Sequence, residues 1–360
     1  MIQKIRLGPD GVITSKRMQP YISGQAQQTP AVKLGRLQKL IKTKTPHICV
    51  VRGEGIGDVL MTTPTVRALR KSFGGRVIIH YATNTRYLDG ALVKVLQYNP
   101  DINEILERQL LDDSKYDLVV NLHCPCIWYE KPGNPPVNRI DLFANHAGVR
   151  PTSTDLAYYI QKDEISAGAK LVSHLQGKKV ILVQPSASSE RRSLDHGKLK
   201  AALTQLSTAH GIMSLVLTHS SDFGTDVLWD NIPGCKTMKD LDVRQIAGLM
   251  VHCDLVLCPD SSILHLAGAL KVPTVAFFGP THPAARINYY PNAVAIWKGE
   301  GLKPCPCWYD ACPISEACWG NTGVNDIVTA CLEHLRSTSR VDISQLTRKS
   351  NTVTISTEII

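Results

Sequence analysis

The residues best suited to chemistry begin with a carboxylate behind a glycine-rich turn. Residues 52–58 read Arg-Gly-Glu-Gly-Ile-Gly-Asp and lie between an apolar, β-branched run and a segment with helical spacing. This order predicts a strand, a tight turn and a helix. Gly55 and Gly57, with Arg52 before them, let the backbone turn sharply and let a ligand approach closely. Asp58 at the helix start makes the turn either a phosphate cradle or a position for a catalytic acid or base, and its negative charge favours the second.

A stretch in the second half of the chain has residues that could hold a diphosphate. Residues 184–192 follow an apolar run with the small residues Ser186, Ala187 and Ser188, and the stretch ends in two arginines. Small side chains expose backbone amides, and the planar fork of Arg192 suits phosphate oxygens. A solvated serine-rich loop is the alternative for this stretch taken alone.

The segment 258–267, Cys-Pro-Asp-Ser-Ser-Ile-Leu-His-Leu-Ala, is a second candidate anion site. A predicted strand runs into Asp260 and a predicted helix begins near Ser262. Asp260 or Ser261 could therefore cap the helix while the remaining amides face an anion. His265 falls on the first turn of the same helix, where a packed or capping histidine is the more common role.

The next predicted strand, Thr274–Phe278, ends in a Gly-Pro turn. Since neighbouring parallel strands end at one edge of a sheet, this turn adds Gly279 and Thr281 to the rim of the same site. A plain strand-ending turn would explain either residue equally well.

Cysteines and closely spaced aspartates raise the question of a metal. Four cysteines fall within fourteen residues, at positions Cys305, Cys307, Cys312 and Cys318. They are close enough to surround one structural zinc or iron ion, although the spacing is not that of a standard pair of Cys-x-x-Cys motifs, and reduced or disulfide-prone thiols are the alternative. Asp240-Leu-Asp242 has the spacing that metal-dependent transferases use. It directly precedes a predicted helix at Val243, so we interpret it as part of a helix start.

Short β-rich runs alternate with helical segments in both halves of the chain, which predicts an α/β class with parallel strands and right-handed crossovers. The expected strands are His47–Arg52, Arg76–Tyr81, Asp117–Asn121, Lys179–Gln184, Met213–Thr218, Asp254–Cys258 and Thr274–Phe278. The expected helices are Asp58–Phe73, Arg86–Gln97, His196–His210, Val243–Val251 and Ser262–Leu270. A Pro-rich loop at 131–137 is expected near a ligand cleft. Two such units facing each other leave a cleft between the carboxyl ends of their sheets.

Length and composition divide the chain into four parts. With 360 residues and 43% hydrophobic content, it can bury a large core and is long enough for two domains. We expect a basic extension over 1–45, a first Rossmann-like domain over 46–165, a second over 166–335, and a Ser- and Thr-rich tail over 336–360. The net charge of +9 favours anionic partners such as nucleotide diphosphates, acidic glycolipids, membrane surfaces or nucleic acid.

The basic stretch 30–45 can form an amphipathic helix with leucines on one face and lysines on the other. It could pack as an ordinary surface helix, or lie on an anionic membrane or on DNA. The first residues lack the apolar core of a signal peptide, and no apolar run approaches the roughly 20 residues that span a bilayer. These features predict a cytoplasmic protein, with peripheral attachment to the inner face of the membrane as the alternative.

At this point several motifs in order carry a family resemblance. They are the stretch Val51–Pro64 with Val66–Arg70, then Asn99–Glu104, Asp260–Ala269 and Phe278–Thr281. The sequence from about 47 to 335 resembles glycosyltransferase family nine, the family of ADP-heptose:lipopolysaccharide heptosyltransferases. The resemblance implies a GT-B fold, in which two Rossmann-like domains face each other across a cleft. It also implies inverting, metal-independent transfer of a sugar from a nucleotide diphosphate, with no cofactor required.

The resemblance assigns roles to individual residues. Asp58 matches the family's proposed general base, and Asp260 its donor-binding aspartate. Arg192 stands where the family usually has a diphosphate-binding lysine, which keeps the charge and changes its geometry. On the phosphate-binding helix start lie Ser261, Ser262 and His265, with Ser262 replacing the usual glycine. Asp222 lies near the position of an acid that contacts the nucleoside, with a poor local match.

The expected function is transfer of a heptose-like sugar from an ADP-heptose-like donor to an acceptor hydroxyl, with an anionic glycolipid such as lipopolysaccharide, or another surface glycan, as acceptor. The same chemistry on protein or on modified DNA is the first alternative, and a non-catalytic protein that binds nucleotide sugars or nucleic acid is the second. A dinucleotide-dependent oxidoreductase fits less well. Asp58 stands where the Rossmann fingerprint has its third glycine, and the strand ending near Tyr81 lacks an acidic residue for the ribose.

Overall fold

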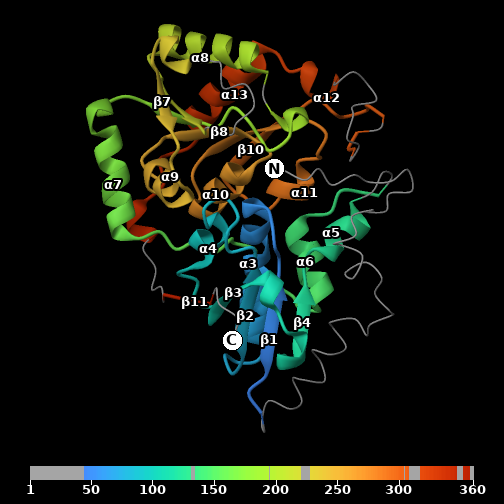
Figure 1. The fold of residues 1–360 in the computed structure, drawn as a ribbon. Helices are drawn as coiled ribbons and strands as arrows, with labels where there is room; N and C mark the ends of the chain where they lie inside the picture. Colours follow the sequence, from blue (N-terminus) through green and yellow to red (C-terminus); the bar gives the residue numbers. More distant parts are fainter. Residues whose placement is uncertain are drawn as a thin grey trace.

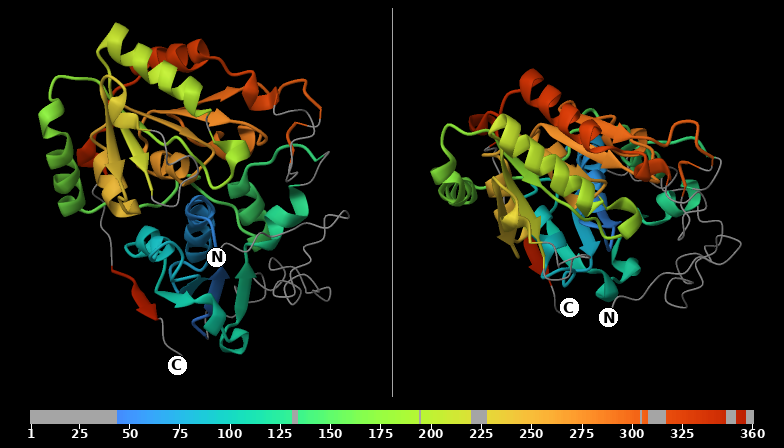
Figure 2. Two further views of the ribbon diagram at one scale, coloured as in Figure 1. Left: turned by 45° about the horizontal axis from the view of Figure 1, so that its top comes forward. Right: turned by 90° about the horizontal axis from the view of Figure 1, so that it is seen from above.

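The computed structural model shows two α/β units, one above the other in Figure 1 and still distinct in the two views of Figure 2. The structure describes residues 44–130, 134–193, 195–219, 228–303, 305–307, 317–346 and 352–356. The predictions for Asp222, for Cys312 and for nearly all of the basic stretch 30–45 lie outside these residues.

The first unit is built on a five-stranded parallel sheet in the order β11-β3-β2-β1-β4. Its strands are β1 (His47–Val51), β2 (Ile78–Thr83), β3 (Glu104–Glu107), β4 (Leu118–Asn121) and β11 (Thr354–Ser356). Its helices are α3 (Ile56–Ser72), α4 (Ala91–Leu96), α5 (Cys124–Tyr129) and α6 (Arg139–Ala147). Because β1 and β4 are parallel neighbours, the turn after β1 and the chain after β4 emerge side by side at one sheet edge.

The second unit is built on a six-stranded parallel sheet in the order β10-β9-β8-β5-β6-β7. Its strands are β5 (Val180–Val183), β6 (Met213–Thr218), β7 (Cys235–Lys239), β8 (Leu255–Pro259), β9 (Thr274–Phe278) and β10 (Ala293–Trp297). The helices are α7 (Lys162–Val172), which leads in from the first unit, then α8 (His196–His210), α9 (Val243–Met250), α10 (Ser262–Leu270), α11 (Ala284–Ile287), α12 (Ala317–Gly320) and α13 (Val324–Ser337). Since β8 and β9 are neighbours, their two following turns share one edge.

The predicted α/β class and the parallel strands are confirmed, and α8 and α10 have the predicted bounds. Asp242 caps α9 in a capping box, which confirms the interpretation of Asp240-Leu-Asp242 as a helix start. The strands β3, β7, β10 and β11 were not predicted. In β7 the exposed Lys236 and Lys239 lie on a sheet-edge strand, where charge protects an open edge and weakens the apolar signal.

The expected tail over 336–360 contains ordered structure. Helix α13 continues to Ser337, and β11 then joins the first sheet beside β3, so the chain returns from the second unit to the first. Val353, just before β11, is buried, and its amide donates to the carbonyl of Gln97 at 2.8 Å. The sequence did not predict this strand. Only three residues pair with β3, and Val353 is the neighbouring apolar side chain that is buried, so the segment has little apolar pattern.

Helix α3 contains an internal proline, and the carbonyl that loses its amide donor still accepts a hydrogen bond. Pro64 has no N–H to donate to the carbonyl of Leu60. The hydroxyl of Thr63 donates to that carbonyl instead, at 2.7 Å. The same hydroxyl accepts from the amide of Ala157 at 2.8 Å, which ties α3 to the segment that leads toward the second unit.

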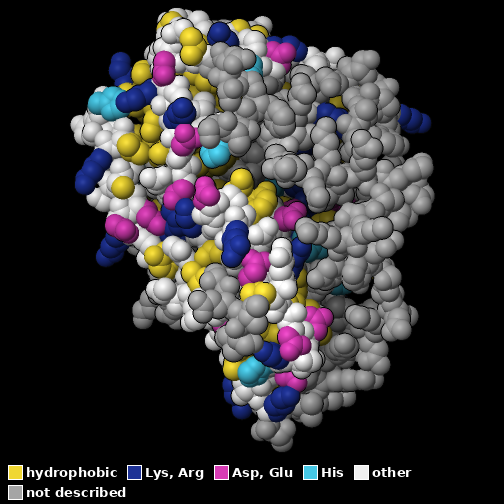
Figure 3. Space-filling model, in the orientation of Figure 1, with side chains coloured by type: hydrophobic (Ala, Val, Ile, Leu, Met, Phe, Trp, Pro, Cys, Tyr) yellow, Lys and Arg dark blue, Asp and Glu magenta, His cyan; other side chains and the backbone are white. Residues whose placement is uncertain are grey.

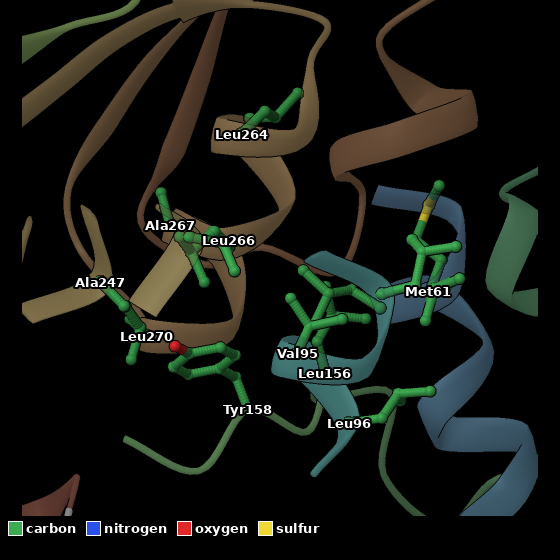
Figure 4. Close-up of a cluster of buried hydrophobic side chains, with 14 of the residues drawn as sticks. Met61, Val95, Leu96, Leu156, Tyr158, Ala247, Leu264, Leu266, Ala267 and Leu270 are labelled. Carbon is green, nitrogen blue, oxygen red and sulfur yellow. The ribbon is translucent and has the colours of Figure 1, made fainter. Parts of the chain in front are cut away.

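Apolar side chains from both units form one continuous core. Figure 4 shows Met61 of α3 and Val95 of α4 on one side and Ala247 of α9 and Leu264 of α10 on the other, with Tyr158 of the connecting segment near them. All five are buried. The two units are therefore joined by apolar packing along α3, α4, α9 and α10.

The surface in view mixes both signs of charge. In Figure 3, Lys and Arg side chains of the described residues alternate with Asp and Glu. Within the described ranges, no helix has the length and apolarity to cross a membrane.

Candidate functional site

Asp58 lies on the first turn of α3, at the mouth of the turn that the sequence predicts. Gly55 precedes the helix with φ of 81°, a left-handed conformation in which a side chain would be strained. A Cβ at this position would also come within 3.0 Å of Asp58 Oδ2. The turn therefore needs glycine both for its backbone and for the space beside the carboxylate.

Two arginines hold the Asp58 carboxylate. Arg52, at the end of β1, reaches Oδ2, and Arg139, the first residue of α6, reaches Oδ1. Burial would raise the pKa of Asp58, but the positive charges of Arg139, Arg52 and Arg286 outweigh it and hold this pKa far below its usual range. Asp58 is thus a carboxylate at any physiological pH.

Arg139 is itself gripped by a second carboxylate. Glu130 accepts from Arg139 Nε at 2.7 Å and from Arg139 Nη2. The same carboxylate accepts from Nη1 of Arg286 of α11 at 3.0 Å, so the contact crosses from the first unit to the second. Glu130 also lines a pocket between the units together with Tyr129 and His282. Asp58, Arg139, Glu130 and Arg286 thus form a chain of ion pairs, and a small cleft reaches this chain at Glu130.

Asp260 is the corresponding carboxylate of the second unit, directly after β8. It is 3% exposed. Its backbone carbonyl accepts from Arg192 Nη1 at 2.8 Å, and its Oδ2 lies 3.6 Å from Arg286 Nε and 3.9 Å from Arg192 Nη1. That oxygen has no hydrogen-bond partner among the described residues. Burial raises the pKa of Asp260, but Arg286, Arg192 and His265 hold it below its usual range.

His265 of α10 packs against Gly57 of α3, across the units at this site. A Cβ on Gly57 of α3 would come within 2.2 Å of His265 Cδ2. Nδ1 of His265 is 2.7 Å from the hydroxyl of Tyr290, and Nε2 is 3.9 Å from Asp260 Oδ1. Burial lowers the pKa of His265 to about 4 despite the opposing effect of Asp260. The ring is therefore neutral near pH 7, and Gly57 is required so that it can approach.

The predicted serine-rich loop lies beside Asp260. The hydroxyl of Ser188 accepts from Arg192 Nη2 at 2.6 Å, and Ser186 lies 3.3 Å from His196 through its hydroxyl. The amide of Ala187 donates to the hydroxyl of Ser193 at 3.0 Å, so this amide is already engaged within the loop. Arg192 thus connects the loop to the start of α10.

The remaining predicted donor residues surround the same edge. Ser261 caps α10 through its backbone, and its buried hydroxyl has no hydrogen-bond partner among the described residues. Ser262 is the first residue of α10. Thr281 is buried, and the carbonyl of Gly279 accepts from the indole of Trp297 at 3.1 Å. The turns after β8 and β9 therefore adjoin, as the sequence predicts.

The cysteine cluster is only partly described. Cys305, Cys307 and Cys318 fall in the described ranges and Cys312 does not. Among the described residues no three Cys, His, Asp or Glu side chains are grouped as metal ligands. Cys307 is buried and accepts from Arg191 Nη2 at 3.1 Å. The donor set that the structure describes is thus incomplete, and no chemical step is assigned to a metal.

Sequence reasoning did not single out Glu130, Arg139, Arg286 or Tyr290. None of them belongs to a motif with a fixed spacing. They come together because the start of α6 meets α11 of the other unit, where Asn138 donates to the carbonyl of Ala284 at 3.3 Å. One signal pointed to the region, namely the Pro-rich loop expected near a cleft, which lies between Glu130 and Arg139.

Comparisons with solved structures give the fold. A glycosyltransferase of family 9 from Veillonella parvula DSM 2008 is 17% identical, with a TM-score of 0.63, and the match covers 81% of this chain and 98% of that one. E. coli ADP-heptose lps heptosyltransferase II is 15% identical, with a TM-score of 0.61 and coverage of 81% and 99%. TibC from enterotoxigenic E. coli H10407, described as an iron-containing dodecameric glycosyltransferase, is 13% identical, with a TM-score of 0.60 and coverage of 82% and 77%.

Comparison with curated proteins gives no match. The family model described as Glycosyltransferase family 9 (heptosyltransferase) matches residues 129–313, just over half of the 360 residues. Its span includes Glu130, Arg139, Arg192, Asp260 and Arg286, so most of the ion-pair chain lies inside it. The two parallel sheets and the solved structures that they resemble give the chain the GT-B fold, and the family model shows that it belongs to glycosyltransferase family 9.

Proposed function

We propose that this glycosyltransferase transfers a heptose-like sugar from ADP-heptose, or a close analogue, to an acceptor hydroxyl with inversion at the anomeric carbon. The observation that carries the proposal is the placement of Asp58 and Asp260. They extend from facing sheet edges of the two units and are linked through Arg139, Glu130 and Arg286. A base on one side and an anion-binding helix start on the other is the arrangement that a single displacement needs.

The charge of the site suits an anionic donor. Among the described residues that form it, four arginines face three carboxylates: Arg52, Arg139, Arg192 and Arg286 against Asp58, Glu130 and Asp260. One positive charge is in excess, and the N-terminal amides of α10 add to it. A diphosphate on the second unit would balance this excess.

In the proposed step, Asp58 accepts the proton of the acceptor hydroxyl while the oxygen forms its bond to the anomeric carbon. The bond from that carbon to the diphosphate breaks on the opposite face, and its electron pair stays on the diphosphate. Arg192 and the start of α10 stabilise the charge that develops there. This route needs no divalent cation, so EDTA should leave the rate unchanged.

The acceptor we propose is an anionic glycolipid of the lipopolysaccharide type or another surface glycan. The test is to incubate the protein with ADP-heptose, UDP-glucose or GDP-mannose and each acceptor class in turn, and to measure nucleotide release and the modified acceptor. Transfer of heptose from ADP-heptose supports the proposal. If the wild-type protein binds and consumes none of these donors, the proposal fails, whereas transfer to protein or DNA corrects only the acceptor.

A structural zinc or iron at the four cysteines Cys305, Cys307, Cys312 and Cys318 remains a separate proposal. Elemental analysis of protein purified without chelator tests it. About one equivalent of metal per chain would support it, and a metal-free protein with reactive thiols would overturn it.

A further inference from the structure

Glu130 occupies an unusual position in the ion-pair chain. It is the one described carboxylate that contacts arginines from both units, Arg139 of α6 and Arg286 of α11. Its side chain is 9% exposed and that of Arg286 is 4% exposed. Burial raises the pKa of Glu130, but Arg139 and Arg286 hold it below its usual range, so Glu130 remains charged. A buried charge with two partners in different units fixes both partners.

The geometry around Arg139 limits how it can meet Asp58. Glu130 takes the Nε and Nη2 side of the guanidinium, and only Nη1 is directed at Asp58 Oδ1. Without Glu130, the fork could turn and bind Asp58 through two nitrogens. Arg52 already holds Oδ2 and Arg139 Nη1 already holds Oδ1. A second nitrogen of Arg139 on the carboxylate would bind it more tightly and make it a weaker base.

We propose that Glu130 is a positioning residue for the transfer reaction, which holds Arg139 to a single contact with Asp58 and ties Arg286 of the donor unit to the same chain. The inference rests on the proposed function. During transfer the proton goes to Asp58 and the negative charge appears on the departing diphosphate. Glu130 then remains as the counter-ion of Arg139, so protonation of Asp58 leaves no buried guanidinium without a partner.

The first test is Glu130→Gln, which keeps the volume and removes the charge. With ADP-heptose and the acceptor that supports wild-type turnover, kcat should fall about tenfold or more, a part of the ~10²–10⁴ that a general base contributes. The KM for ADP-heptose should stay within about threefold, because Glu130 acts on the base rather than on the nucleotide. An unchanged kcat would overturn the proposal.

Glu164→Gln is the matched control. Glu164 grips Arg244 through the same two nitrogens, also at a contact between the units, but away from Asp58. It should lower the free energy of unfolding and leave kcat within about twofold. Equal losses of kcat in both variants would mean that Glu130 acts through general destabilisation, against the proposal.

A second readout separates positioning from a structural role. In an Asp58→Asn background, Glu130→Gln should cause no further loss of kcat, since the base on which Glu130 acts is already gone. If the two substitutions instead lower kcat by independent factors that multiply in the double variant, the proposal is overturned.

A third measurement does not depend on activity. Urea unfolding of Glu130→Gln, Arg286→Met and the double variant should show non-additive losses if the bridge exists in solution, and additive losses would overturn it. The failures are therefore distinguishable. A wild-type protein without transferase activity rejects the proposed function, while an active wild type with additive variants rejects the role of Glu130 alone.

Discussion

Two of the contacts between the units use the same kind of ion pair for different purposes. In one, Glu164 of α7 binds Nε and Nη2 of Arg244, and in the other Glu130 binds Nε and Nη2 of Arg139. The difference lies in the third nitrogen. Nη1 of Arg244 donates to the backbone carbonyl of Lys94 at 3.0 Å, whereas Nη1 of Arg139 meets the carboxylate of Asp58.

The surroundings of Arg244 and Arg139 differ in the same way as their Nη1 partners. The guanidinium of Arg244 lies between the rings of Tyr98 and Tyr158, 4.8 and 4.7 Å from their centroids, and it also donates to the carbonyl of Tyr159 at 2.8 Å. Apart from Glu164, the partners of Arg244 are rings and carbonyls, so no second carboxylate is held beside it. We call this contact the Arg244 clamp and assign it a structural role. Around Arg139 the partners are carboxylates beside a pocket, and the same ion pair can take part in a reaction.

The largest expected effect tests the reactive side of the comparison. Asp58→Asn should lower kcat by about 10²–10⁴, because the amide cannot act as the general base. Arg139 keeps Glu130 as a partner, so the variant should fold and bind ADP. Asp155→Asn, which removes a half-exposed partner of Lys271, is the control and should keep full turnover. Full turnover by Asp58→Asn would remove Asp58 from the mechanism.

The next effect tests the Arg244 clamp. Arg244→Met leaves the partly buried Glu164 without its partner and should lower the free energy of unfolding by about 3 kcal/mol, measured by urea unfolding. The KM for ADP-heptose should change little, since the residues that hold Arg244 are not among the proposed donor-binding residues. Arg340→Met removes an arginine that is 41% exposed and paired with Asp254, and should cost about 0–1 kcal/mol. A loss in Arg244→Met no larger than in this control would end the distinction between the two contacts.

Local sequence patterns predicted the motifs on each side of the site better than the links between the two sides. The turn before Asp58 and the start of α10 at Ser262 follow from glycine and capping signals next to apolar runs, and both are found where predicted. Motifs of this kind are contiguous in sequence, so their chemistry can be read without the fold. The α/β class followed for the same reason, because each strand and helix carries its own periodicity.

The links depend on distant residues and could not be read in this way. Glu130 and Arg286 are 156 positions apart, and neither has a neighbour pattern that marks it. Arg244 is separated from Glu164 by 80 positions, and its sequence environment is that of an ordinary helix start. Strand β11 was not predicted because it forms by pairing with β3, and its own composition has no strand pattern.

A smaller effect tests how closely the units meet at the reactive side. Alanine usually suits a helix better than glycine by about 1 kcal/mol. At Gly57, however, the added Cβ would lie 2.2 Å from the ring of His265. Gly57→Ala should therefore lower the free energy of unfolding by about 1–3 kcal/mol and reduce turnover, because the ring must move. Gly320→Ala is the control, since a Cβ there meets no atom of the described residues within 4 Å. A stabilised, fully active Gly57→Ala would show that the units do not meet in this way in solution.

The last effect is a pH dependence from His265, which is absent at pH 7 and appears only on acidification. Its pKa is about 4 in the fold, mainly because of burial, against about 6.5 in the unfolded chain. Between these values the unfolded state binds one proton more than the native state, so the free energy of unfolding falls as the pH drops from 6.5 to 4, by up to about 1.4 kcal/mol per pH unit. His265→Gln should remove this part of the slope, whatever it does to stability at pH 7. His123, also buried, has a pKa of about 3, so its contribution should persist in the variant and extend to lower pH. An unchanged slope between pH 6.5 and 4 would mean that His265 is open to solvent, and that the contact on Gly57, unlike the Arg244 clamp, does not hold the units together.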